Sequence, residues 1–391
     1  MSYDFDKIID RRNTDSLKYD FAVRRGRPKA ILPLWVADMD FQTPDCVIDA
    51  LVEKSRHGIY GYSEPDEKEY FSVLKNWFGE SFGWEIQPNW LIKTPGVVVA
   101  LCAAVRSLTE VGDSVIIQQP VYYPFHEAVI DNGRKLVVNE LKYENGRYTI
   151  DFDDFERKIV ENDVKLFILC NPHNPVGRVW TREELTRLGE ICAKRGVIVV
   201  SDEIHADFIY AGHKHTVFAD IRLEFAEISV TCTAPSKTFN LAGLQVSNIF
   251  IPNDKLRIKF KRELTGSGLS QMNIMGIVAC RAAYSGGREW LNELKTYLAE
   301  NLDFLRAFLK ENLPSVKLVE PQGTYLVWLD CRELNLADSE LDEIIVNKAG
   351  LWLDNGTMFG AGGSGFQRVN IACPRSILEK ALLQLKKGLT G

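Results

Sequence analysis

The sequence predicts an α/β fold, in which a large domain with a mostly parallel, helix-covered sheet is joined to a smaller α+β domain. Through the middle of the chain, short apolar runs alternate with amphipathic helical patterns, as in a parallel sheet with helices on both faces. After residue 287 this alternation gives way to one long helical pattern, followed by mixed strands and helices. The 391 residues are enough for two domains and a large core.

The composition excludes several classes of protein. Hydrophobic residues make up 46% and charged residues 26%, as in an ordinary soluble protein. A net charge of −6 gives no basic footprint for nucleic acid, and no apolar run approaches the ~18 residues of a membrane span. Residues 1–15 are charged without a signal-peptide core, and the eight cysteines form no CxxC pair. We therefore expect a cytoplasmic protein without a nucleic-acid or membrane partner.

The first hundred residues predict helices and one candidate anion site. Thr43 is expected to cap a helix that starts at Pro44 and ends near His57, and a second helix is expected over 66–79. Gly96 precedes a continuous apolar stretch, which predicts a buried helix whose start could bind an anion. Three valines in a row are poor helix formers, so a plain core helix and a short strand are the alternatives.

The central part predicts buried strands separated by helices. Thr181 and Glu184 form a capping-box pattern at the start of one helix, and Gly196 is expected to end it. The expected strands cover 114–118, 135–141, 165–170, 196–201 and 228–233, and the expected helices cover 152–162 and 181–195.

Four side chains follow the ends of these strands: Tyr122, Asn174, Asp202 and Lys237. Ligands of parallel sheets bind beyond the carboxyl ends of the strands, so we expect these residues to lie together. Plainer interpretations are a turn residue for Asn174, and a helix cap or ion-pair partner for Asp202. A carboxylate buried at Asp202 would be costly unless a cation paired with it.

Lys237 is the candidate reactive group. It follows a β-prone run and lies in an expected loop of small residues, after which apolar sequence resumes at Phe239. Burial favours the neutral amine, and neutral lysine forms imines with carbonyl compounds. The alternative is a lysine whose stem lies on the surface and whose charge stays in water.

The histidines do not predict a metal site. The spacing of His173, His205, His213 and His215 matches no set of metal ligands, and the segment 213–215 is expected to be a solvated loop.

The last hundred residues predict a different pattern. Apolar residues at helical spacing predict one long helix over 288–312, and Pro314 marks its end. A glycine-rich stretch at 359–365 is interpreted as a linker in preference to a substrate gate. Further strands are expected at 316–320, at 324–330 and near 351 and 367, with helices over 338–348 and 376–388.

Four motifs in this order resemble the cofactor motifs of the fold type I pyridoxal-phosphate enzymes, the aminotransferase class I/II superfamily. They are NPHNPVG (171–177), DEIH (202–205), SKTFNLAG (236–243) and FQRVNIACPR (366–375). WVADMDF (35–41) and GYS (61–63) are similar to segments of the MalY/PatB-type C–S lyases, the cystathionine β-lyases. The resemblance implies a large cofactor domain over 46–287, a small domain built from 1–45 and 288–391, and a homodimer with shared active sites.

The resemblance also implies roles around the pyridoxal 5′-phosphate ring. Lys237 would hold the cofactor as an imine and then remove the substrate's Cα proton. Asp202 would face the ring nitrogen, Asn174 would bind the ring hydroxyl, and Tyr122 would stack on the ring. His205 stands where many aminotransferases have a tyrosine that contacts the same hydroxyl.

The phosphate and the substrate have their own implied partners. Backbone N–H groups of Gly96, Val97 and Val98 would bind the phosphate, together with Ser236. Tyr62 would reach the phosphate of the partner subunit and contribute to catalysis. The carboxylate of an amino-acid substrate would be held by Arg368, for which a surface strand position is the alternative.

Two departures from the aminotransferase pattern favour the lyases. Gln245 replaces a phosphate-binding arginine, and His205 replaces the tyrosine; Ala234 also stands where many relatives have a serine. The implied activity is β-elimination from cystathionine or a related cysteine S-conjugate, giving a thiol such as homocysteine, pyruvate and ammonia. The alternatives are an aminotransferase on the same scaffold and a non-catalytic binding protein.

Overall fold

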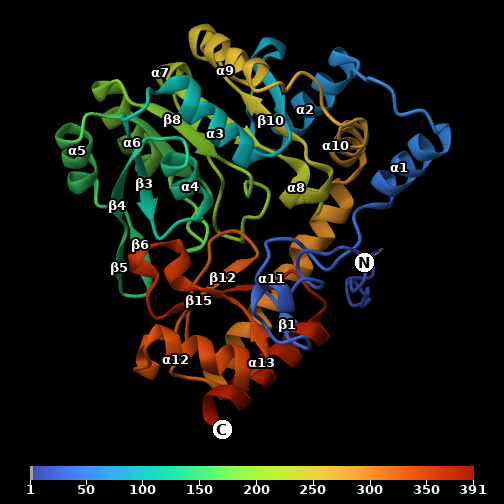
Figure 1. Ribbon diagram of the computed structural model, residues 1–391, viewed down its shortest axis with the longest axis vertical. Helices are drawn as coiled ribbons and strands as arrows, with labels where there is room; N and C mark the ends of the chain where they lie inside the picture. The colour runs from blue at the N-terminus through green and yellow to red at the C-terminus, as the bar shows by residue number, and fades with distance from the viewer. Residues whose placement is uncertain (1–2) are drawn as a thin grey trace.

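The computed structural model describes residues 3–391 and has two parts, one above the other in Figure 1. The upper part contains a seven-stranded sheet with helices on both faces, and the lower part contains a four-stranded sheet with the C-terminal helices. The predicted α/β class is therefore confirmed. Within residues 3–391, no helix is both long and apolar enough to cross a membrane.

The large sheet has the strand order β2-β10-β9-β8-β7-β3-β4. Strand β10 is antiparallel to both of its neighbours, and the strands from β9 to β4 run parallel. All the predicted central strands are present. The strands are β2 (Leu91–Thr94), β3 (Ser114–Gln119), β4 (Lys135–Glu140), β7 (Val164–Cys170), β8 (Ile198–Asp202), β9 (Ser229–Thr233) and β10 (Ser247–Phe250).

Alternate side chains of the strands enter two separate cores. On β3, Val115 and Ile117 belong to one core and Ile116 to the other, because successive side chains of a strand point to opposite faces. Leu166 and Phe167 on β7 divide in the same way. One face is covered by α3 (Val97–Leu108), α4 (Pro124–Ile130) and α9 (Asp254–Gly266), and the other by α5 (Phe152–Glu161), α6 (Arg182–Arg195) and α7 (Leu223–Glu227).

Tertiary packing and caps decide the helices of this part. Helix α3 forms despite its valines because Ala100 and Leu101 lie fully buried against the sheet, which excludes the alternative of a strand. Helix α6 has the predicted capping box of Thr181 and Glu184, and Gly196 ends it in the left-handed conformation.

The two N-terminal helices differ slightly from the prediction. Helix α1 (Asp45–His57) begins one residue late, since the Thr43 hydroxyl donates to the Phe239 carbonyl at 2.9 Å and caps nothing. Helix α2 (Glu67–Phe82) is capped by the Asp66 side chain, and Gly83 ends it in the left-handed conformation. Helix α10 (Ile274–Gly286) packs against both.

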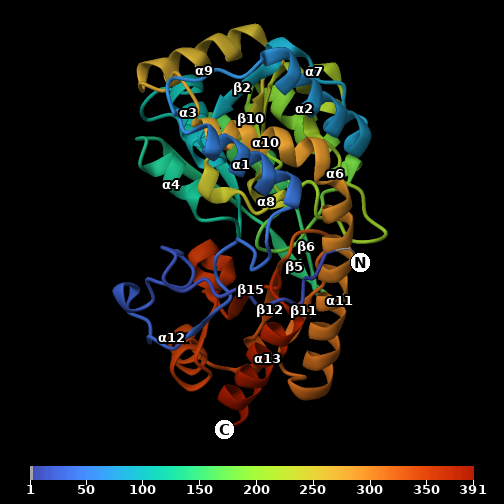
Figure 2. The same cartoon turned by 90° about the vertical axis from the view of Figure 1, so that its right-hand side faces the viewer.

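The lower part is built from the C-terminal third of the chain. Helix α11 (Arg288–Asn312) matches the predicted range and runs from the upper part down beside the smaller sheet, as Figure 2 shows. The smaller sheet has the order β11-β12-β15-β14, with β11 (Lys317–Val319), β12 (Leu326–Asp330), β14 (Asp354–Asn355) and β15 (Phe366–Asn370). The helices here are α12 (Asp338–Glu343), continued by a π-helical turn, and α13 (Arg375–Thr390). A hairpin of β5 (Lys142–Glu144) and β6 (Arg147–Thr149) lies between the two sheets, as Figure 2 shows.

The N-terminal segment packs against this lower part. Strand β1 (Leu32–Pro33) pairs in parallel with β13 (Leu351–Trp352), and Trp35 stacks on Trp352 with ring centroids 4.3 Å apart. This pairing agrees with a small domain built from both ends of the chain. The boundaries at residues 45/46 and 287/288 stay predictions.

Candidate active site

The polar residues that follow the strands gather at one edge of the large sheet. Asp202 is the last residue of β8, and Lys237 follows β9. The predicted loop around Lys237 is instead a short helix, α8 (Pro235–Thr238), which Pro235 opens at its first position. The backbone N–H of Tyr122, after β3, donates to the Asn174 carbonyl at 3.1 Å.

Lys237 has the environment of a reactive amine. Its Nζ donates to the Ala37 carbonyl at 2.9 Å, from the N-terminal segment. Burial lowers the pKa of Lys237 to about 8; the nearby Arg368 cation lowers it further, whereas Asp38 and Asp202 act in the opposite direction. A substantial fraction of the amine is therefore neutral near physiological pH.

Asp202 is shifted toward its neutral form by the same desolvation. It is 5% exposed, and burial raises its pKa to about 7. The Ile204 N–H, which donates to Asp202 Oδ1 at 3.1 Å, and the Lys237 cation both limit this rise. Residues 204–207 form a turn and not a helix, so the plainer interpretation of Asp202 as a helix cap is wrong. A cationic group placed beside Asp202 would hold it ionised.

Arg368 lies inside the protein. It is 3% exposed on β15, so the alternative of a surface position is wrong. Its Nη1 donates to Asn174 Oδ1 at 3.0 Å, and its Nη2 donates to the Trp35 carbonyl at 2.8 Å and forms an ion pair with Asp354. Arg368 Nε has no hydrogen-bond partner within residues 3–391. The guanidinium is thus held in place by the Nη contacts, and its Nε–H remains available to donate to a ligand.

His205, Tyr122 and Tyr325 complete the set of side chains at the site. Burial lowers the pKa of His205 well below its ordinary value, and the cations of Lys237 and Arg368 add to this effect, so its imidazole is neutral. His205 Nδ1 is buried without a partner in the described part of the chain. Burial raises the pKa of Tyr122 above its ordinary value, which keeps its hydroxyl protonated. The Tyr325 hydroxyl donates to the Ala37 carbonyl at 3.0 Å, beside Lys237.

The start of α3 is arranged as the sequence predicted for an anion site. Gly96 has φ of 127°, and it caps the helix without a side-chain hydrogen bond. Val97 and Val98 provide the first backbone N–H groups, which point out of the helix start. Because β2 runs into α3 and is parallel to the main strands, this helix start lies at the same edge as Asp202. Ser236, in α8, is partly buried.

Tyr62 lies on the surface, unlike the buried groups of the site. Its side chain is 98% exposed, and it lines a hollow of about 490 Å³ together with 271–275. Gln245, at the position of the missing arginine, is exposed with a φ of 51°. Apart from Tyr62 and Arg368, the sequence-predicted residues thus belong to one edge of the large sheet. Arg368, on β15 of the smaller sheet, meets this edge through its hydrogen bond to Asn174. The role of Tyr62 stays a prediction.

The expectation of a solvated loop at 213–215 is wrong for one residue. His215 is 3% exposed, and its Nε2 lies 2.8 Å from Glu203 Oε2, while Ser201 donates to the other oxygen of Glu203 at 2.8 Å. An edge-to-face contact with the Phe82 ring also stabilises the buried position of His215. No group of three or more His, Cys, Asp or Glu side chains in residues 3–391 could hold a metal ion.

Sequence reasoning missed the groups that hold the site residues. Ala37 accepts hydrogen bonds from Lys237 and Tyr325 through its backbone carbonyl, and Asp354 pairs with Arg368. A backbone acceptor carries no signal in the sequence. The WVADMDF motif, which resembles a segment of the C–S lyases, contacts Lys237 through the Ala37 carbonyl.

Comparison with known proteins agrees with this geometry. The family model described as aminotransferase class I and II matches residues 29–385. The chain belongs to the aminotransferase class I and II family. This confirms the resemblance drawn from the four motifs.

Named members of the family resemble the chain over its whole length. "Cystathionine beta-lyase PatB" from Bacillus subtilis is 47% identical over 386 residues, covering 99% of this chain and 100% of the relative. The structure of cystalysin from Treponema denticola, which contains pyridoxal 5′-phosphate, has a TM-score of 0.96 and 39% identity and covers 100% of this chain and 99% of its own. A PLP-bound putative aminotransferase from Clostridium difficile 630 has a TM-score of 0.97 and 44% identity, covering 99% and 100%.

Proposed function

We propose that this member of the family is a pyridoxal-phosphate-dependent C–S β-lyase. It cleaves cystathionine or a related cysteine S-conjugate to a thiol, pyruvate and ammonia. The observation that carries the proposal is the partly buried Lys237, with its lowered pKa, at the same sheet edge as buried Asp202. The choice of C–S bond cleavage is supported by the full-length similarity to a cystathionine β-lyase and to cystalysin.

The residues present fit the cofactor group by group. A neutral amine suits the aldehyde, and a buried carboxylate suits the ring nitrogen. The α3 start, with Gly96 as its cap, suits the phosphate. The buried Nδ1 of His205 and the Nε of Arg368 lack partners within residues 3–391, so the site contains polar atoms that a bound ligand would satisfy.

We assign the cofactor to Lys237, Asp202, Asn174 and Tyr122, with His205 beside the ring. We assign binding of the phosphate to Gly96, Val97, Val98 and Ser236. When bound, pyridoxal phosphate withdraws electrons from the substrate Cα and makes its proton acidic. Asp202 would keep the ring nitrogen protonated and so support this electron withdrawal.

The side chains of the chain then move the protons. Arg368 binds the substrate carboxylate, and Asp354 and the Trp35 carbonyl hold the guanidinium in orientation. Lys237 Nζ, with its lowered pKa, would take the Cα proton as a general base. The same amine, once protonated, is placed to return a proton to the departing thiolate.

A second candidate is an aminotransferase. It is favoured by the putative aminotransferase from Clostridium difficile, which is 44% identical over nearly the whole chain. Lys237, Asp202 and Arg368 would act identically up to removal of the Cα proton. His205 and Gln245, which replace the tyrosine and the arginine common in aminotransferases, favour the lyase.

We infer that the enzyme works as a cytoplasmic homodimer. Tyr62, which is 98% exposed, would reach the phosphate in the partner subunit and contribute to catalysis there. The hollow that it lines adjoins a second hollow of about 650 Å³, which shares Ser63 and Met272 with it. All eight cysteines are free thiols, which suits a reducing compartment.

The test is an assay of the cofactor-loaded protein with cystathionine, in the presence and absence of a 2-keto acid. A C–S lyase releases thiol and pyruvate in equal amounts without the keto acid. Amino transfer that depends on the keto acid, without thiol, would reject the lyase in favour of the second candidate. Lys237→Ala should lose at least ~10³-fold of the rate, since it removes the base, whereas exposed Lys255→Ala in α9 should retain it.

A further inference from the structure

Residues 35–41, here called the strap, present backbone carbonyls to the cations of the site. The Trp35 carbonyl accepts from Arg368 at 2.8 Å, and the Ala37 carbonyl accepts from Lys237 at 2.9 Å. Asn370, on β15, donates to the Val36 and Asp38 carbonyls at 2.6 Å each. The strap therefore provides a hydrogen-bond acceptor to each of the two functional cations.

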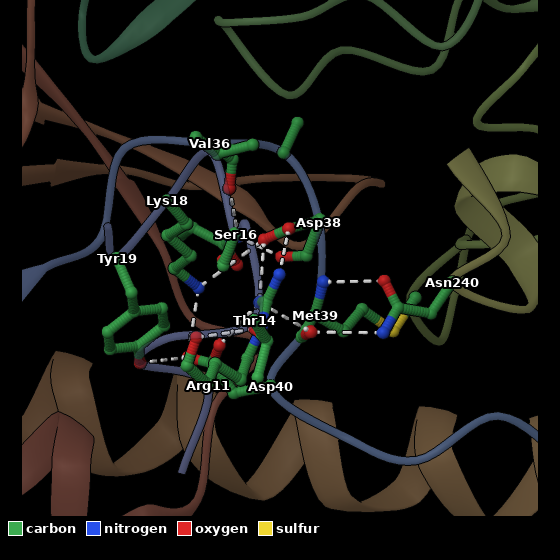
Figure 3. Close-up of polar contacts among 12 residues, drawn as sticks. Arg11, Thr14, Ser16, Lys18, Tyr19, Val36, Asp38, Met39, Asp40 and Asn240 are labelled. Atoms are coloured by element: carbon green, nitrogen blue, oxygen red, sulfur yellow. Dashed lines mark hydrogen bonds and ion pairs between the residues drawn. The ribbon is translucent and has the colours of Figure 1, made fainter. Parts of the chain in front are cut away.

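The strap is also fixed to the segment that carries Lys237. Asn240, three residues after Lys237, accepts from the Met39 N–H at 2.9 Å and donates to the Met39 and Phe41 carbonyls at 3.0 Å each. Figure 3 shows this pairing of Asn240 with the Met39 backbone on one side of the strap. The position of the strap is thereby coupled directly to that of Lys237.

The opposite side of the strap holds a compact ion cluster, which Figure 3 also shows. Arg11 donates to Asp38 through both of its Nη atoms, at 3.1 and 2.5 Å, and to Asp40 at 2.8 Å. Lys18, whose side chain is 0% exposed, lies 2.9 Å from Asp40 and 3.7 Å from Asp38. Tyr19 donates to Asp40 at 3.1 Å. The positive charges of Arg11 and Lys18 neutralise the negative charges of Asp38 and Asp40 in this partly buried cluster.

The Asp38 carboxylate is near enough to Lys237 to act on it. It is the largest influence that opposes burial in setting the lysine's pKa, and it raises that pKa. Asp38 therefore has three possible cationic partners, which are Arg11, Lys18 at 3.7 Å, and Lys237. Arg11 holds it with two hydrogen bonds, and Lys237 binds the uncharged Ala37 carbonyl of the neighbouring residue.

We propose that Arg11 is a positioning residue for Lys237: it holds the Asp38 carboxylate, so that the strap offers Lys237 a carbonyl instead of a charge. This arrangement keeps the amine available as a nucleophile and base. Lys18 supports it by neutralising Asp40. The inference rests on Lys237 being the reactive amine of the proposed function.

The pKa of Lys237 depends on the charged and polar groups that surround it. Those that face it with charge or polarity are Asp38 from the strap, Asp202 and His205 from the end of β8, Arg368 from β15, and Tyr325 through the shared Ala37 carbonyl. Loss of the Arg11 cation leaves Asp38 with only the more distant Lys18 cation, 3.7 Å away, so more of its negative charge acts on the amine. Loss of the Asp38 charge removes the main influence that stabilises the ammonium form.

The experiment measures acetylation of Lys237 by acetic anhydride in the cofactor-free protein over a pH series, with peptide mass spectrometry as the readout. Arg11→Gln should move the midpoint of labelling upward by about one pH unit, and Asp38→Asn should move it downward by about as much. The double variant should behave like Asp38→Asn alone, because Arg11 acts on Lys237 through the Asp38 carboxylate. Arg12→Gln, which removes an exposed ion pair with Asp10, should leave the midpoint unchanged.

Opposite signs separate positioning from mere loosening of the fold, which would shift both variants the same way. Shifts in one direction, or no shift in Asp38→Asn, would overturn the proposal. If Arg11→Gln does not fold, the downward shift of Asp38→Asn decides alone. The readout needs neither cofactor nor turnover, so its failure is distinct from failure of the lyase assay.

Discussion

At the scale of single residues, the site depends on two groups that burial shifts toward neutrality. The pKa of Lys237 falls to about 8, and that of Asp202 rises to about 7, because water is excluded from both. A carboxylate and an amine in this condition gain from a ligand that supplies a cation to the first and an aldehyde to the second. The free protein therefore holds an unfavourable arrangement that cofactor binding relieves.

This strain predicts a stabilising substitution. The folded protein keeps the Asp202 proton up to about pH 7, while the unfolded chain releases it near 3.8, so folding loses stability as the pH rises through this window. Asp202→Asn removes the buried charge and still accepts from the Ile204 N–H. We expect the cofactor-free variant to be more stable than the wild type at pH 8 by roughly 2–4 kcal/mol. Denaturant unfolding at several pH values measures this difference.

The difference should shrink as the pH falls toward 4, where both folded states are neutral at this position. Asp153→Asn, at a side chain that is 96% exposed, is the matched control and should change little. A variant that is less stable than the wild type at pH 8 would show that Asp202 is already well paired without the cofactor.

The residues that sequence reasoning found and those that it missed differ in kind. Lys237, Asp202 and Asn174 follow recognisable strands, so their common location could be predicted from local pattern. The Ala37 carbonyl and the Asp354 partner of Arg368 could not, because they arise from contacts between segments far apart in the chain. His215 was misplaced for the same reason.

At the scale of elements, hydrophobic periodicity located most helices and strands. Helix α11 was predicted over the residues that it occupies, since its apolar stripe runs without interruption. Five strands of the large sheet (β3, β4, β7, β8 and β9) were predicted from their apolar runs. The short strands β2 and β10 were not predicted, because polar residues interrupt their sequences. Boundaries shifted where a cap decides them, as at Thr43, whose hydroxyl bonds to Phe239.

The start of α3 gives a prediction at this scale. Gly96 has a φ of 127°, which a residue with a Cβ adopts only under strain, although an added Cβ would meet nothing within 4 Å. Gly96→Ala should therefore disturb the backbone N–H groups that we assign to the phosphate. We expect about tenfold weaker binding of pyridoxal phosphate, measured by titrating the cofactor-free protein.

Gly112→Ala is the control for backbone strain. Gly112 has a φ of 89° in a turn before β3, and there too a Cβ would meet nothing within 4 Å. Both variants should lose roughly 1 kcal/mol of folding stability, and Gly96→Ala alone should lose cofactor affinity. Equal affinity losses in the two variants would remove α3 from the phosphate site.

At the scale of the whole molecule, the site requires segments from both parts of the chain. The large sheet supplies Lys237 and Asp202, β15 of the smaller sheet supplies Arg368, and the N-terminal strap binds both cations. Pairing of β1 with β13 brings the strap to this position. The sequence alone located the large sheet and its polar edge, and the motif resemblance was needed to place Arg368 there. Periodicity does not reveal which distant segments meet.

The most direct measurement of the central claim is borohydride reduction of the cofactor-loaded protein, followed by peptide mapping. Reduction fixes the cofactor to the amine that holds it, and mass spectrometry identifies that amine. We predict one pyridoxyl phosphate group per chain on the peptide that contains Lys237, with loss of the visible absorbance of the bound cofactor. A group on another lysine, or no labelled peptide at all, would contradict the account.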